Sequence, residues 1–94
     1  MFHAISRTEM LKYSIAVTAE KGIEMYFSYS ATDTIRSLNE WIQQHMGIPS
    51  AKQRIHSIPR GYFHPIIELK NNSNELLINR LKNAASINVA LKKQ

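Results

Sequence analysis

The sequence of 94 residues contains no cysteine. Disulfides, thiol catalysis and cysteine-ligated zinc are therefore excluded, and the absence fits a reducing compartment. The three glycines are scattered, so a glycine-rich phosphate-binding loop is excluded as well. No apolar run is long enough for a signal peptide or a membrane-spanning helix. These absences predict a soluble, intracellular protein without membrane association, located in the cytoplasm or alternatively in the nucleus.

Residues that could carry catalysis or bind metals are also scarce. Asp33 is the only aspartate, and its place at a helix start already explains it, so a Ser-His-Asp triad lacks a free orienting aspartate. The four histidines do not have the spacing of zinc ligands. Glu68 and Glu75 flank a polar loop and have no partner that indicates acid–base catalysis. We therefore predict no enzymatic activity, no catalytic residue, no metal, no cofactor and no small-molecule substrate.

The composition is that of one globular domain. Hydrophobic residues make up 44% of the chain and charged residues 20%, which argues against wholesale disorder. The formal net charge is +5, and such a charge attracts acidic partners at long range. The simpler alternative is that the positive charge only keeps a basic surface soluble. Residues 1–10 are predicted to form an N-terminal extension, and residues 11–92 the domain.

The clearest local signal is an amphipathic helix over residues 35–46. Thr34 is the expected N-cap, Gly47 suits the left-handed residue that ends a helix, and Pro49 prevents continuation. The apolar stripe consists of Ile35, Leu38, Ile42 and Met46, with Trp41 at its edge. The opposite, polar side is expected to hold Arg36, Asn39, Glu40, Gln43 and Gln44.

Two runs of alternating residues, 11–18 and 23–29, predict an antiparallel hairpin. The loop between them contains Gly22, which can take positive φ in a bulged turn. The inward residues are expected to be Leu11, Tyr13, Ile15, Val17, Ile23, Met25, Phe27 and Tyr29.

The remainder of the chain alternates between strands and short elements. We expect strands at 53–58 with Ile55 inward and at 86–91 with Ile87, Val89 and Leu91 inward, a short edge strand within 62–69, a polar loop at 70–74 and helical turns at 75–81. The fold class is therefore α+β: a mixed sheet of four or five strands with one main helix across one face. The first and last strands are expected to be parallel neighbours.

Three short segments, in order and in register, resemble ubiquitin and its relatives: Thr32-Asp33-Thr34-Ile35, Gly47-Ile48-Pro49 and Gln53-Arg54-Ile55. The resemblance extends over most of residues 11–92, with an insertion near 62–75. It implies the β-grasp fold. Conjugated members end in a tail with two glycines, whereas no glycine follows Gly61 here. The expectation is a ubiquitin-like module that is not conjugated, or a domain of a longer protein.

The resemblance also indicates a binding surface on the open face of the sheet. Glu20, His56 and Ala90 occupy the positions of the family's apolar patch, which is therefore lost. Arg54, Arg60 and Lys92 are expected on or beside this face and would make it basic. We therefore predict protein–protein interaction, with an acidic partner surface, through a basic sheet face, through the 60–75 insertion, or through both. Tyr26 and Trp41 are additional candidate contacts; alternatively, Trp41 is a core residue at the helix edge.

Two other functions remain open from the sequence. Arg54-Ile55-His56 and Arg60-Gly61-Tyr62-Phe63 combine basic and aromatic residues, a pattern that can bind single-stranded nucleic acid by phosphate contacts and base stacking. The structural alternative is that Tyr62 fills a core position and the arginines are solvated. The domain could also be a regulatory or targeting part of a larger multidomain protein.

Overall fold

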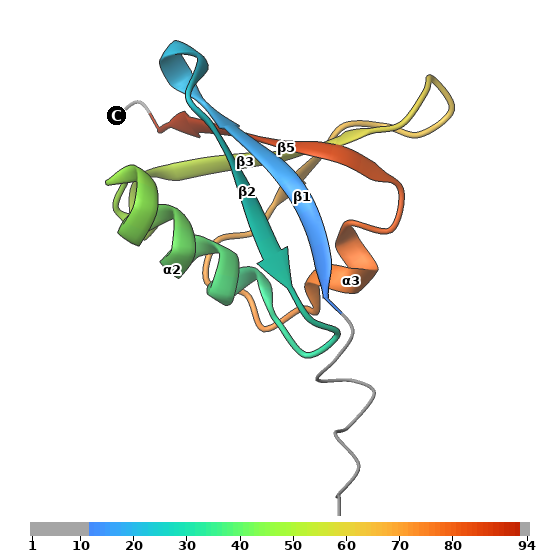
Figure 1. Ribbon diagram of the computed structural model, residues 1–94, viewed down its shortest axis with the longest axis horizontal. Helices are drawn as coiled ribbons and strands as arrows, with labels where there is room; N and C mark the ends of the chain where they lie inside the picture. Colours follow the sequence, from blue (N-terminus) through green and yellow to red (C-terminus); the bar gives the residue numbers. More distant parts are fainter. Residues whose placement is uncertain (1–11, 93–94) are drawn as a thin grey trace, which may run out of the picture.

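The computed structural model describes residues 12–92, so the expected N-terminal extension lies outside the described residues. A five-stranded sheet has the order β2-β1-β5-β3-β4, and one long helix, α2, lies across one face (Figure 1). The elements are β1 (Tyr13–Ala19), η1 (Glu20–Gly22), β2 (Glu24–Tyr29), α2 (Ile35–Met46), η2 (Ser50–Lys52), β3 (Gln53–Pro59), β4 (Ile67–Leu69), α3 (Leu77–Arg80) and β5 (Ala84–Leu91). The central strands β1 and β5 are parallel and the other pairs antiparallel, which confirms the predicted mixed sheet.

The helix α2 begins and ends where the sequence predicts. The Ser37 N–H donates to Thr34 Oγ1 at 3.3 Å, and the Thr34 N–H donates to Ser37 Oγ at 3.2 Å. This reciprocal cap satisfies backbone groups that have no partner within the helix. At the other end, Gly47 has a φ of +73°, and its N–H donates to the Gln43 carbonyl at 3.1 Å. Glycine adopts the left-handed backbone conformation at little energetic cost, which is why the helix stops there.

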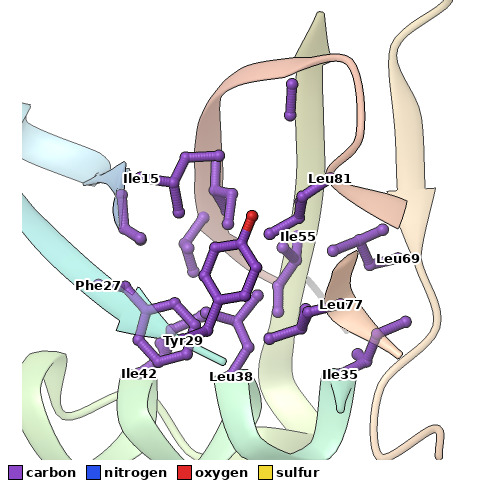
Figure 2. Close-up of a cluster of buried hydrophobic side chains, with 14 residues drawn as sticks. Ile15, Phe27, Tyr29, Ile35, Leu38, Ile42, Ile55, Leu69, Leu77 and Leu81 are labelled. Atoms are coloured by element: carbon purple, nitrogen blue, oxygen red, sulfur yellow. The ribbon is translucent and has the colours of Figure 1, made fainter. Parts of the chain in front are cut away.

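The core lies between α2 and the inner face of the sheet (Figure 2). Its buried hydrophobic residues are Ile15, Val17, Phe27, Tyr29, Ile35, Leu38, Ile42, Ile55, Leu69, Leu77, Leu81, Ala84, Ile87 and Val89. Three residues predicted to face inward are exposed instead: Tyr13, Ile23 and Leu91. They lie at the ends of strands or just before one. Alternation predicted which face of the sheet each side chain is on, but not whether other residues cover that part of the face.

Asn39 corrects the expected polar side of α2, because its side chain is 0% exposed. Its amide Nδ2 donates to Gln53 Oε1 at 2.7 Å and to Asn71 Oδ1 at 3.0 Å. The Asn72 N–H donates to Asn39 Oδ1 at 2.8 Å. A buried amide is tolerated when it is hydrogen-bonded, and here it joins α2 to β3 and to the loop after β4.

Tyr29 ends β2 with its ring in the core, stacked between Phe27 and Tyr13. Burial, with a smaller contribution from Tyr13, raises the pKa of Tyr29 above its ordinary value of 10.0. Desolvation disfavours the phenolate, so the folded chain holds this proton more tightly than the unfolded chain does.

This raised pKa predicts a loss of stability at alkaline pH. The contribution of Tyr29 is complete below about pH 10 and is lost as the pH rises through the folded pKa, because the unfolded tyrosine ionises first. We therefore expect the free energy of unfolding of Tyr29→Phe to fall less than that of the wild type over this pH range. Tyr13, Arg60 and Lys82 line the same pocket and are present in both proteins. Urea unfolding between about pH 8 and pH 11 would measure the difference; parallel profiles for variant and wild type would contradict it.

Candidate functional site

Five of the residues predicted to bind a partner lie together at one end of the open sheet face, which α2 does not cover. Arg54 on β3 stands directly opposite Ala90 on β5. One shallow depression is lined by Glu20, His56 and Ala90, and the next by Glu20, Arg54, Ala90 and Lys92. The residues meet because alternate positions of neighbouring strands share a face. The structure thus groups Glu20, Arg54, His56, Ala90 and Lys92, and their role in binding stays a prediction.

Glu68 on β4 belongs to the same surface, although the sequence analysis did not place it there. It stands opposite His56 in the register of β3 and β4. Its carboxylate lies 3.7 Å from Arg54 Nε and 3.8 Å from His56 Nε2. With Glu20 nearby, the face carries charges of both signs. Its position between Ile67 and Leu69 indicated a short strand. The sequence did not show, however, which residues of β3 that strand pairs with.

Glu20 is also held in place at this end of the sheet. It lies in η1, the turn that joins β1 to β2, and its Oε1 accepts the Leu91 N–H at 3.3 Å. Lys21 and Gly22 in the same turn have positive φ values of 69° and 77°. The predicted positive φ at Gly22 is confirmed, and it lets the chain reverse tightly enough to bring Glu20 beside the end of β5.

Arg60 lies at the opposite end of β3 from this group, and its expected place on or beside the open sheet face stays a prediction. Arg54 is near the start of β3, whereas Arg60 follows the end of that strand, roughly 20 Å away at about 3.3 Å per residue. The Arg60 N–H donates to the Asn83 carbonyl at 2.9 Å, which ties it to the start of β5. The two arginines are therefore separated by the length of β3.

The two aromatic candidates lie elsewhere. Tyr26 is exposed on β2, the edge strand farthest from β3 in the sheet's strand order. Trp41 is half-buried, with its ring centroid 5.1 Å from that of Phe27 and 4.7 Å from that of His45. It packs against the core, which favours the interpretation of Trp41 as a core residue at the helix edge.

Among residues 12–92, the most exposed aromatic side chains lie in the loop between β3 and β4, residues 60–66. This segment, here called the aromatic loop, projects away from the sheet as the yellow arch in Figure 1. Tyr62 is 100% exposed and Phe63 is 96% exposed, and Ile66 is exposed as well. The alternative that Tyr62 fills a core position is therefore wrong: the loop reaches beyond the layers, and Leu69, Leu77 and Leu81 fill that part of the core.

The described residues gather no set of groups with evident chemistry. Among residues 12–92, no three His, Cys, Asp or Glu side chains come together as metal ligands would. Glu75 is paired with Arg80, whose Nε lies 2.9 Å from Glu75 Oε2. In the same part of the chain, no helix combines the length and the apolar composition needed to cross a membrane.

Comparisons with known proteins identify the architecture. No protein-family model and no curated protein sequence matches the chain. A computationally designed protein based on the template of human erythrocytic ubiquitin superposes with a TM-score of 0.62, at 16% identity, over 86% of this chain and 92% of that chain. The C-terminal ubiquitin-like domain of mouse tubulin-specific chaperone e superposes with a TM-score of 0.64, at 8% identity, over 88% and 87%. The strand order, the helix across the sheet and these superpositions together show that the chain has the ubiquitin-like β-grasp fold.

Proposed function

We propose that this chain is a non-conjugated ubiquitin-like module that binds another protein, with the aromatic loop as the main contact. The observation that carries the proposal is the exposure of Tyr62 and Phe63 in the projecting loop between β3 and β4. Aromatic side chains dominate binding energy at protein interfaces, and exposing two of them on a monomer brings no folding benefit.

The sheet face is the second contact surface in this proposal. Arg54 and Lys92 contribute positive charge there, but Glu68 and Glu20 offset it. Exposed ion pairs such as Arg54–Glu68 contribute only about 0–1 kcal/mol. A partner with an acidic surface would compete with Glu68 for Arg54 and His56. The net charge of +5 would accelerate such an encounter without fixing its geometry.

The test compares variants of the two surfaces. Proteins captured from lysate by the labelled chain would be identified, and their affinity measured for each variant. We expect the double variant Tyr62→Ser/Phe63→Ser to weaken binding about 100-fold or more, since an aromatic hot spot contributes about 2 kcal/mol or more. Its free energy of unfolding should change by less than about 0.5 kcal/mol, because both side chains are fully exposed.

Two further variants make the comparison specific. Tyr26→Ser removes an exposed aromatic residue far from the loop and should leave binding unchanged. Arg54→Glu reverses a charge on the sheet face and should weaken binding less than the loop variant does. If the loop variant and Arg54→Glu both retain every partner at wild-type affinity, neither surface is the interface and the proposal fails.

Nucleic acid is the competing partner class, because Arg60 adjoins the exposed aromatic loop. A labelled single strand should then bind with a strong dependence on salt, since phosphate contacts release counterions. Absence of binding at about 50 mM salt would remove this candidate.

A regulatory or targeting domain within a larger protein is a second form of the same function. The mouse chaperone structure is itself a C-terminal domain of its protein, so this fold occurs as an appended domain. Reading the natural transcript on both sides of the 94 residues distinguishes the forms: a frame that continues in either direction supports the appended domain, and a frame that continues in neither contradicts it.

A further inference from the structure

A pocket of about 370 Å³ opens at the end of the molecule opposite the Glu20–Arg54 group. It lies where the start of β1, the end of β2, the residue after β3, the region of α3 and the start of β5 meet. Its volume is within the range of small-ligand sites, roughly 300–1,000 Å³. We call it the Tyr29 pocket; its lining is Tyr13, Ser14, Ile15, Tyr29, Arg60, Ile78, Leu81, Lys82, Ala84 and Ala85.

The charges of the Tyr29 pocket have one sign. Arg60 and Lys82 line it, and no carboxylate does. Arg60 donates from Nε to the Ala84 carbonyl at 3.5 Å, and within residues 12–92 neither cation forms an ion pair. Arg54 and Arg80, by contrast, each have a glutamate partner. Two unpaired cations in a concave site raise the local concentration of anions.

Tyr29 adds a hydrogen-bond donor from the floor of the pocket. The residue is 6% exposed, and its hydroxyl has no hydrogen-bond partner among residues 12–92. The hydroxyl is not sealed in the core either, because no buried side-chain nitrogen or oxygen of the described chain lacks a partner. Figure 2 shows the oxygen directed between Ile15 and Leu81, which both line the pocket. Because this hydroxyl is open to the pocket, it can donate a hydrogen bond to a molecule that binds there.

Apart from Ser14, the rest of the wall consists of apolar side chains and tyrosine rings. Ile15, Ile78, Leu81 and the tyrosine rings would surround a hydrocarbon or aromatic body, while the cations face its charged end. Burial raises the pKa of Tyr29, so at neutral pH its hydroxyl keeps the proton and can donate to an anion. Apolar walls with a few convergent polar groups are the usual composition of a small-molecule site.

We propose that the Tyr29 pocket binds an oxyanion, a carboxylate or a phosphate, carried on a small apolar body. Arg60 and Lys82 neutralise the oxyanion, the Tyr29 hydroxyl donates a hydrogen bond to it, and Ile15, Ile78 and Leu81 enclose the body. The site uses Arg60, the first residue of the aromatic loop, but neither Tyr62 nor Phe63, so the variants that test it differ from those that test the proposed protein-binding function.

The experiment titrates the 94-residue chain, labelled with ¹⁵N, with benzoate, phenyl phosphate and benzyl alcohol. We expect saturable shifts of the Tyr13, Arg60 and Ala85 amides with both anions. Whichever anion binds more tightly shows whether the pocket prefers a carboxylate or a phosphate. Benzyl alcohol has the same aromatic body without the charge and should bind about tenfold more weakly or worse.

Three variants locate the binding energy. Arg60→Gln/Lys82→Gln removes two exposed cations and should weaken anion binding about tenfold or more while leaving benzyl alcohol unchanged. Lys52→Gln removes an exposed cation next to the far end of β3 and should have no effect. Tyr29→Phe keeps the ring in the core and should weaken binding of the anions only, by about three- to tenfold.

Three results would overturn the proposal. One is equal affinity for benzyl alcohol and the anions, which would make the pocket purely apolar. Another is that the amide shifts do not saturate, or that the largest shifts occur at Arg54 and His56, which lie outside the pocket. The third is unchanged anion binding in Arg60→Gln/Lys82→Gln.

Discussion

Replacing Leu38 with Ala should lower the free energy of unfolding by about 3–5 kcal/mol, the largest effect we expect from one substitution. Leu38 is 0% exposed and lies in the middle of α2, between Ile35 and Ile42 in the apolar stripe. The change removes buried methyl groups and leaves a cavity that the close-packed core fills only in part. Because a domain of this size has only about 5–15 kcal/mol of stability, this loss would remove a large part of the total.

Urea unfolding followed by circular dichroism would measure the change. Gln44→Ala on the exposed side of the same helix is the matched control, and it should change the free energy by less than about 0.5 kcal/mol. A loss below about 1 kcal/mol for Leu38→Ala would contradict the packing of α2 across the sheet.

Replacing Asn39 with Leu should cost about 2–5 kcal/mol through a different mechanism. The substitution keeps the volume similar but removes the partner of Gln53 Oε1 and of the Asn72 N–H. Each polar group left buried without a partner costs about 1–3 kcal/mol. The Asn71–Asn72 segment would also lose its side-chain tether to α2.

A double-mutant cycle separates this network from ordinary packing. Gln53→Leu removes the other buried amide, so the double variant Asn39→Leu/Gln53→Leu should be less destabilised than the sum of the two single variants. Coupling of at least about 0.5 kcal/mol is expected. Asn74→Leu, at an exposed position in the same loop region, is the control. Additive single effects would show that the two amides are not energetically linked.

Local patterns sufficed for the parts of the fold that depend on neighbouring residues. The bounds of α2 follow from the Thr34 cap and the Gly47 stop, both of which act within one turn of the helix. The hairpin of β1 and β2 follows from strict alternation on either side of a short glycine-containing loop. These features need no knowledge of the rest of the chain, which is why they could be predicted.

The candidate surfaces depended on contacts between distant segments. Arg54 and Ala90 were expected on one face of the sheet, and the register pairs them directly across β3 and β5. Glu68 was not expected there, because its place beside Arg54 depends on how a three-residue edge strand pairs. The exposure of Tyr62 was equally out of reach, since an aromatic residue suits a core or a surface until the course of the insertion is known.

The sequence by itself determined the α+β class, the main helix with both its ends, and the parallel pairing of the first and last strands. Helix periodicity, strand alternation and capping act over a few residues, so they can be read directly. Only the tertiary structure decided that Asn39 is buried, that Arg60 is separated from Arg54, and that Tyr29 opens into a cationic pocket. Each of these outcomes depends on which distant side chains share a space, and that is set by packing rather than by local preference.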